Sequence, residues 1–349
     1  MISVLSCMKD DELWENTKPE INTPYKGLYV INEGNYMYGN ASLSYYDIES
    51  RQVHNDVFFN TNSLPLGDVA QSMVIRNGLA YVVLNNSGKI YILDANTFEY
   101  KGKITGLTSP RYMHFISDIK AYVTDLYGKS IAIVNPQSKE ITGSIDVSTS
   151  DNQFYRHSTD HMVQFENLIF TNCWSYDNQI LVIDSDTDEV VDSIQVQEQP
   201  VALVIDDFGK IWTITDGGYT MNGTTSTPAL IKIDAETREI ERTIYFNNTD
   251  HPIELKLNGA GDRLYFLNSD VYTMDVITGS EPELFVESPY ETVIGGYYGL
   301  AVDPITDEVY VADAIDFVQQ GVIYRYTSNA EPVDTFKVGI VPGEFCFKY

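Results

Sequence analysis

The stretch at residues 79–94, LAYVVLNNSGKIYILD, reads as a β-strand, a turn and a second β-strand that ends in Asp. Alternating β-branched and aromatic residues on both sides of a polar turn favour two antiparallel strands. With its six variants elsewhere in the chain, this stretch makes seven copies at intervals of 41 to 53 residues. Aligned on their second apolar position, the copies fall at Tyr29, Tyr81, Tyr122, Ile169, Trp212, Tyr265 and Tyr310. A period of this length with no helical pattern predicts an all-β, seven-bladed β-propeller with four antiparallel strands per blade.

The flanking sequence completes each blade. In the second repeat, strands are expected over residues 69–75, 79–84, 89–94 and 99–104. The turns between the third and fourth strands begin with Asp or Asn, whose side chains hydrogen-bond backbone groups two residues on, so these residues are interpreted as structural. The first unit lacks an inner strand, whereas residues 342–349, PGEFCFKY, supply a spare one. The C-terminal strand is therefore predicted to pair with the N-terminal blade and close a single domain over residues 25–349.

Composition limits the possible partners. Aromatic residues make up 12% of the 349 residues and charged residues 21%, which suits half-buried sheets. The 22 Lys and Arg against 50 Asp and Glu give a net charge of −28. This charge disfavours nucleic acid and anionic membrane surfaces as partners.

Residues 1–24 are expected to lie outside the propeller, as a signal-peptide remnant, a lipidation site and a tether. Val4, Leu5 and Ser6 before Cys7 look like the end of a lipoprotein signal, although most of the apolar segment of such a signal is missing. The MKDD that follows Cys7 resembles the export signal of Bacteroidetes surface lipoproteins. The sequence thus predicts a lipid anchor on Cys7, outer-membrane localisation and exposure at the cell surface, with the anchor as the sole membrane contact. Cys173 and Cys346 fall in distant repeats and are predicted to be free thiols.

Strand connections alternate between the two ends of a propeller. Turns from the first to the second strand and from the third to the fourth share one end, and these are short throughout the sequence. We call the other end the long-loop face, because long, irregular loops are expected there. These loops cover residues 32–40, 59–69, 146–160, 173–179, 216–228, 287–299 and 312–321. Long loops on a rigid ring are a usual place for binding.

Aromatic residues and amides dominate these loops. Rigid aromatics supply contact area and amides supply adaptable hydrogen bonds, which suits recognition of a bulky, uncharged polar ligand. Arg111, Arg156 and His157 add donors for a ligand phosphate or acetamide. The candidate ligand-binding residues are Tyr36, Tyr38, Arg111, Tyr155, Arg156, His157, Trp174, Tyr176, Tyr219, Tyr297, Tyr298 and Phe317.

No catalytic motif is present in the sequence. His157 and His161 lie four apart in RHSTDH, but a loop does not present them on one helical face, and no Cys or Glu near them in sequence completes a ligand set. We therefore expect neither a metal nor a cofactor, and no enzyme activity is assigned.

Copies such as AYVTDL, AYVVLN and VYVADA make residues 25–349 similar to the seven-bladed propellers with YVTN-type repeats, the YncE-like family. Combined with the lipoprotein features, the chain resembles the cobalamin-binding surface propellers of Bacteroidetes (BtuG type). That resemblance implies capture of cobalamin or a related corrinoid and its delivery to a TonB-dependent outer-membrane transporter.

Three alternatives remain open from the sequence. Aromatic platforms also stack on sugar rings, so a glycan or another nutrient is a second ligand class. A propeller lyase or lactonase would need a His and carboxylate cluster at the channel mouth, for which His157, Asp160 and His161 are the candidates. A protein-binding scaffold would favour a flat, charge-patterned face.

Overall fold

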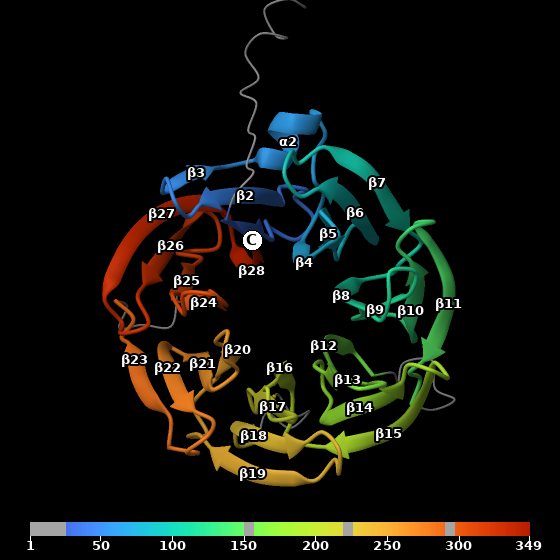
Figure 1. The fold of residues 1–349 in the computed structure, drawn as a ribbon, viewed down its shortest axis with the longest axis vertical. Helices are drawn as coiled ribbons and strands as arrows, with labels where there is room; N and C mark the ends of the chain where they lie inside the picture. The colour runs from blue at the N-terminus through green and yellow to red at the C-terminus, as the bar shows by residue number, and fades with distance from the viewer. Residues whose placement is uncertain (1–25, 150–156, 219–225, 290–296) are drawn as a thin grey trace, which may run out of the picture.

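A computed structural model describes residues 26–149, 157–218, 226–289 and 297–349. These residues form seven four-stranded antiparallel sheets arranged as a ring around a central axis (Figure 1). The predicted seven-bladed, all-β propeller is confirmed. Among the described residues, no helix is both long and apolar enough to span a bilayer.

Each blade runs from an innermost strand near the axis to an outermost strand at the periphery of the ring. Blade 1 consists of β28 (Pro342–Lys348), β1 (Gly27–Asn32), β2 (Ser42–Asp47) and β3 (Gln52–His54). Blade 2 consists of β4 (Ala70–Arg76), β5 (Leu79–Leu84), β6 (Lys89–Asp94) and β7 (Tyr100–Thr105). Blade 3 consists of β8 (Pro110–Phe115), β9 (Ala121–Asp125), β10 (Ser130–Asn135) and β11 (Glu140–Asp146). Blade 4 consists of β12 (Thr159–Phe165), β13 (Leu168–Cys173), β14 (Gln179–Asp184) and β15 (Glu189–Gln195).

The remaining blades repeat this order. Blade 5 consists of β16 (Pro200–Ile205), β17 (Lys210–Thr215), β18 (Ala229–Asp234) and β19 (Ile240–Tyr245). Blade 6 consists of β20 (Ile253–Leu257), β21 (Arg263–Asn268), β22 (Asp270–Asp275) and β23 (Glu283–Val286). Blade 7 consists of β24 (Tyr297–Val302), β25 (Val309–Asp313), β26 (Gln320–Tyr326) and β27 (Pro332–Ile340).

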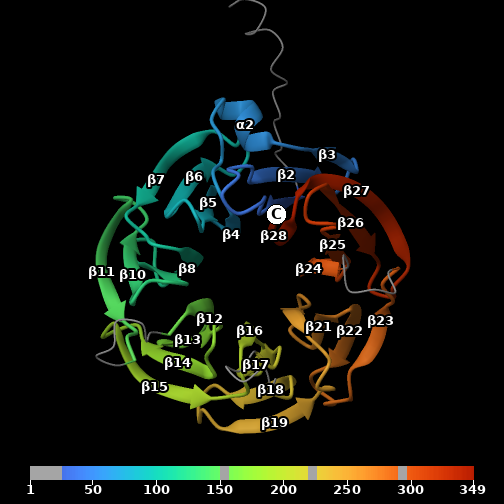
Figure 2. The ribbon, with the colours of Figure 1, turned by 180° about the vertical axis from the view of Figure 1, so that it is seen from behind.

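The two ends of the chain close the ring. Strand β28 pairs antiparallel with β1, from Gly27 opposite Lys348 to Asn32 opposite Pro342. In Figure 2 the red strand β28 lies on the inner side of the blue strands β2 and β3, with which it shares a blade. This is the predicted closure, and it gives the inner edge of β1 a hydrogen-bonded partner.

The second strand of each blade is buried on both faces, because neighbouring blades pack face to face, whereas the fourth strands are largely exposed. In β1, Tyr29 and Ile31 pack with residues of blade 2. Leu28 and Val30, which point to the other side, pack with Tyr310 and other residues of blade 7. The alternation that defines a strand therefore reads as a nearly continuous apolar run.

The Asp and Asn residues at the turns between third and fourth strands have the predicted structural role. Asp94 Oδ1 accepts hydrogen bonds from the backbone N–H groups of Asn96 and Thr97, at 2.9 and 3.0 Å. Equivalent bonds to two backbone N–H groups are formed by Asp47, Asn135, Asp184, Asp234 and Asp275. These side chains hold the turns in shape, which is a structural role.

One short helix replaces part of a predicted loop. Residues 59–69 were expected to be irregular, but α2 (Val57–Asn62) occupies the start of that connection. Its residues Val57 and Phe58 are buried, and the Phe58 ring stacks on Tyr91 with centroids 5.2 Å apart. Packing of two apolar side chains on the outer part of blade 2 stabilises a helix that has no periodic pattern in the sequence.

Candidate functional site

Each inner strand carries an irregularity at its second residue, at the end that meets the long-loop face. In β4, Ala70 pairs with Leu84 and Ser72 with Val83, which leaves Gln71 outside the ladder. The same break occurs in all seven blades, and such bulges re-aim a side chain. The residues left out of pairing are Gln71, Arg111 with Tyr112, Asp160 with His161, Val201, Glu254, Tyr298 and Gly343.

Most of these residues, with Glu33, Lys256 and Glu344, form one polar group around the axis that we call the channel cluster. Its members are Glu33, Gln71, Arg111, Tyr112, Asp160, His161, Glu254, Lys256, Tyr298 and Glu344. Contacts between blades that are not neighbours place the cluster inside the ring. Lys256 Nζ of blade 6 lies 3.1 Å from Glu344 Oε1 of blade 1.

Arg111 and Asp160 form the best-defined pair of the cluster. Arg111 Nε donates to Asp160 Oδ1 at 2.8 Å, and a terminal guanidinium nitrogen donates to Gln71 Oε1. Asp160 is 2% exposed. Although burial alone would raise the pKa of Asp160, Arg111 and then His161 hold it well below its usual value. Asp160 is therefore a permanent anion that fixes the guanidinium.

The guanidinium of Arg111 also lies over the ring of Trp174, 5.0 Å from its centroid. This contact connects two predicted site residues from blades 3 and 4. On the far side of Asp160, His161 Nδ1 lies 3.4 Å from Asp160 Oδ2, and the His161 ring faces Tyr112 with centroids 4.0 Å apart.

Lys256 is held between two carboxylates. Its Nζ lies 3.1 Å from Glu254 Oε2 as well as 3.1 Å from Glu344 Oε1. Burial would lower the pKa of Lys256, but the two carboxylates raise it, so the ammonium stays charged. Burial raises the pKa of Glu254, and Lys256 opposes that rise.

Glu33 fills the place that a side chain at Gly343 would take. A Cβ on Gly343 would lie 2.1 Å from Glu33 Oε1, so glycine is needed there for close approach. Tyr298 donates its hydroxyl to the Glu33 carboxylate, at 3.1 and 3.2 Å from the two oxygens. Burial raises the pKa of Glu33 to about 7, with Arg111 and Tyr298 opposing it. This carboxyl changes its charge near neutral pH.

A cavity of about 250 Å³ lies along the inner strands next to the cluster. Tyr112, His161, Lys256 and Glu344 give it a polar wall, and Met73, Leu203 and Leu255 contribute apolar surface. Its lining comes from six blades, so the cavity is part of the central channel.

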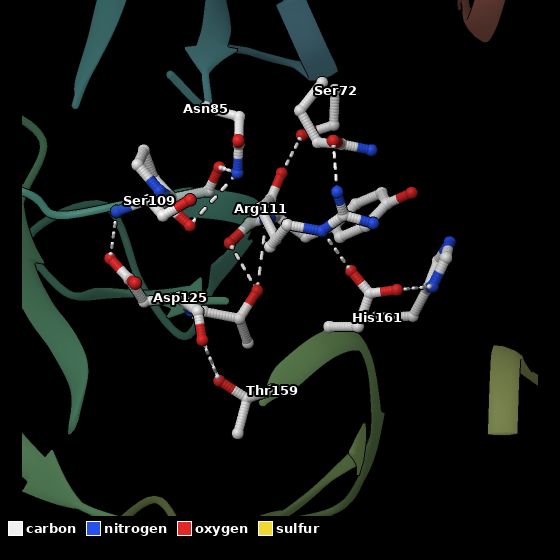
Figure 3. A network of polar contacts seen from close by, with 12 residues as sticks. Ser72, Asn85, Ser109, Arg111, Asp125, Thr159 and His161 are labelled. Carbon is white, nitrogen blue, oxygen red and sulfur yellow. Dashed lines mark hydrogen bonds and ion pairs between the residues drawn. The ribbon is translucent and has the colours of Figure 1, made fainter. Parts of the chain in front are cut away.

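Hydrogen bonds between successive blades hold the rim of the channel in place (Figure 3). Ser72 Oγ donates to the backbone oxygen of Arg111 at 2.6 Å. Asn85 Nδ2 donates to the backbone oxygens of Ser109 and Pro110, both at 3.2 Å. The Asp125 N–H donates to Thr159 Oγ1 at 3.2 Å. Polar residues that end the second strand of one blade thus fix the start of the next inner strand.

Exposed aromatics stand on the long-loop face around this rim. Tyr36 and Tyr38 of the β1–β2 loop are 66% and 79% exposed, and Tyr176 of the β13–β14 loop is 77% exposed. Phe317 of the β25–β26 loop is 41% exposed and meets the Tyr298 ring edge-on, with centroids 5.3 Å apart. Rings that expose this much surface are available to a ligand.

Three other predicted residues are less exposed than these rings. Tyr297 is 7% exposed and packs inside blade 7, where its hydroxyl lies 3.3 Å from that of Tyr326. His157 pairs with Asp177, with Nδ1 2.6 Å from Oδ2. Trp174 is half-buried beneath Arg111. Tyr155, Arg156, Tyr219 and the predicted lipidation site Cys7 lie outside the described residues.

His157 and His161, considered together from their spacing, have separate surroundings. His161 belongs to the channel cluster, whereas His157, Cys173 and Asp177 form a second cluster. One potential ligand atom from each of these three residues lies within 4.8 Å of the others. Cys173 is one of two free cysteines among the described residues, with Cys346, as predicted.

Several residues of the channel cluster were not predicted, namely Glu33, Gln71, Tyr112, Glu254, Lys256 and Glu344. For Gln71 and Glu254 the available signal was a polar residue at the second position of the inner strand, which five of the seven inner strands share, as in PRYMHF, TDHMVQF and IELKL. That signal is visible only once the seven inner strands are aligned. Tyr127, 60% exposed in the β9–β10 loop, is a further unpredicted aromatic on the same face.

Similar solved structures share the fold at low sequence identity. A quinonprotein alcohol dehydrogenase-like protein from Bacteroides thetaiotaomicron VPI-5482 is 14% identical, with a TM-score of 0.69 over 93% of this chain and 79% of that one. Hydrazine synthase of Kuenenia stuttgartiensis is 16% identical, with a TM-score of 0.58 over 71% and 73%. The computationally designed Ika8 protein is 11% identical, with a TM-score of 0.58 over 92% and 96%.

No curated protein matches the chain in sequence. A family model described as a domain of unknown function, DUF5074, matches residues 26–341, which is nearly the whole propeller. The chain therefore belongs to the DUF5074 family.

Proposed function

We propose that this protein captures a bulky, largely uncharged polar small molecule on the long-loop face, over the mouth of the channel. The observation that carries the proposal is the set of exposed tyrosine rings, Tyr36, Tyr38 and Tyr176, around a rim whose centre is polar. Aromatic faces give a ligand contact area at a low cost in conformational entropy. The hydrogen bonds between blades hold the site in shape before binding, which limits the ordering cost further.

The ligand proposed is cobalamin or a related corrinoid. Its ring system is broad, and its amide side chains need both donors and acceptors. The channel cluster offers both kinds of group, with Arg111 and Lys256 as cations among carboxylates. Within this proposal, lipidation of Cys7 anchors the protein at the cell surface, and a TonB-dependent transporter receives the ligand.

A lyase or lactonase is less well supported by the same geometry. The carboxylate of Asp160 lies 3.4 Å from His161 Nδ1, and it is held ionised by Arg111. A carboxylate with a low pKa that is already paired is a weak general base.

The test is a titration of the full chain with cyanocobalamin. Binding is measured by calorimetry and by the change in the absorption spectrum of the ligand. Tyr36→Ala, Tyr38→Ala and Tyr176→Ala are each expected to weaken binding by about tenfold, since large exposed aromatics are typical energetic anchors. Phe208→Ala is the matched control, because Phe208 is 57% exposed in the β16–β17 turn on the opposite face.

Saturable binding that is lost in the tyrosine variants and kept in Phe208→Ala supports the proposal. Absence of heat and of any spectral shift at high cyanocobalamin concentration contradicts the corrinoid assignment. Unchanged affinity in all three tyrosine variants contradicts the location on the long-loop face. A parallel titration with neutral oligosaccharides distinguishes a glycan-binding propeller.

A further inference from the structure

We propose that His157, Cys173 and Asp177 bind a divalent cation of the zinc type on the long-loop face of blade 4. Imidazole, thiolate and carboxylate are the three kinds of ligand that zinc uses in proteins. One candidate ligand atom from each residue lies within 4.8 Å of the others, so small side-chain rotations bring all three to one ion. Three protein ligands leave a fourth position for water or a ligand.

The backbone holds the three residues in place. Cys173 is the last residue of β13 and pairs with Thr159 of β12. Next to it, the Trp174 N–H donates to the backbone oxygen of Ser158 at 2.9 Å. The cluster thus lies where the start of β12 meets the end of β13.

The other two ligands are tied to neighbouring loops. The His157 N–H donates to the backbone oxygen of Val147 at 3.0 Å, and the Gln199 N–H donates to the backbone oxygen of Asp177 at 2.8 Å. A site on anchored backbone loses little entropy when an ion binds.

The charges fit a divalent ion. A thiolate and a carboxylate together carry two negative charges and neutralise the cation, which favours binding in a partly buried place. Cys173 is fully buried, so its sulfur is shielded from bulk water. An ion that binds there displaces the thiol proton, as cysteine-ligated metals do.

Partial exposure leaves the cluster open to solvent on one side. The side chains of His157 and Asp177 are 20% and 12% exposed, so an ion can enter between them. A nucleophilic Cys–His–Asp triad fits this geometry less well, because the thiol has no exposed surface for a substrate.

The test uses the full chain, freed of metal with a chelator and titrated with Co²⁺ in place of zinc. We expect one equivalent to bind with a thiolate-to-cobalt charge-transfer band and the visible spectrum of a tetrahedral ion, and Zn²⁺ to displace it. Cys173→Ser should abolish the charge-transfer band. His157→Gln and Asp177→Asn should each weaken Co²⁺ affinity by about tenfold or more.

Cys346→Ser is the matched control, since Cys346 is the other free thiol of the described residues and lies in β28, outside the cluster. It should keep the charge-transfer band and the affinity of the parent chain. Circular dichroism checks each variant, and if Cys173→Ser does not fold, the His157 and Asp177 variants decide the question.

A parent chain without the charge-transfer band overturns the proposal. So does a folded Cys173→Ser variant that keeps the band, or Asp177→Asn and His157→Gln variants with unchanged affinity. No corrinoid is present in this experiment, so its result is independent of the function proposed above.

Discussion

At the scale of single residues, Glu33 is a buried carboxyl whose charge changes near neutral pH. Its folded-state pKa of about 7 lies above the ordinary value of 4.5, mainly because of burial. While the carboxyl is protonated in both the folded and the unfolded protein, its raised pKa does not change the free energy of unfolding. The cost to the folded state appears as the pH rises above about 4.5 and is complete above about 7. The parent protein therefore loses stability across this window as Glu33 ionises.

Glu33→Gln removes that ionisation and keeps a side chain that can accept from Tyr298. We expect equal free energies of unfolding for parent and variant near pH 4.5, and a variant more stable by about 1–3 kcal/mol near pH 8. Denaturant unfolding at several pH values measures the difference. Glu99→Gln is the control, because Glu99 is exposed and paired with Lys101. A difference that is constant with pH would refute the assignment to Glu33.

Residues differ in how much of their role the sequence reveals. Asp94 and Asn135 could be assigned to turns because their hydrogen bonds are local, to residues two and three positions on. Glu33 could not be assigned, since its place depends on the absence of a side chain at Gly343. Tyr297 and Tyr298 are neighbours in sequence, yet Tyr297 pairs in the ladder and is buried in blade 7, whereas Tyr298 is the bulge residue and reaches Glu33 in the channel.

At the scale of elements, β28 joins the first and last blades. Phe345 of this strand is 7% exposed and packs with Leu28, Val30 and residues of blade 7. Phe345→Ala is expected to lower the free energy of unfolding by about 3–5 kcal/mol, because it removes a buried aromatic side chain where blade 1 packs against blade 7. Thermal and denaturant unfolding measure the loss.

Phe59→Ala is the matched control, since Phe59 is 55% exposed on α2. Its expected effect is within about 0.5 kcal/mol. Equal losses in the two phenylalanine variants would mean that β28 contributes no more than surface packing.

Strand positions were predictable to within a residue or two because each blade repeats the same alternation. The second repeat was expected at residues 69–75, 79–84, 89–94 and 99–104, and β4 to β7 lie at Ala70–Arg76, Leu79–Leu84, Lys89–Asp94 and Tyr100–Thr105. Helix α2 and the bulges were not predictable. They depend on packing between strands and on register, which no single repeat contains.

At the scale of the whole molecule, acidity opposes the compact ring. A net charge of −28 at pH 7 places many like charges on one domain, and their mutual repulsion raises the free energy of the folded state more than that of the expanded chain. Salt screens this repulsion between exposed charges.

The melting temperature at pH 7 is therefore expected to rise by several degrees between low and high NaCl concentration. Near the sequence pI of about 4.3 the net charge vanishes, so the same increase in salt should have little effect there. Differential scanning calorimetry at both pH values measures the two salt dependences. KCl should act like NaCl, because screening depends on ionic strength and not on the ion. Equal salt effects at the two pH values would show that repulsion is unimportant for this propeller and that salt acts through hydration instead.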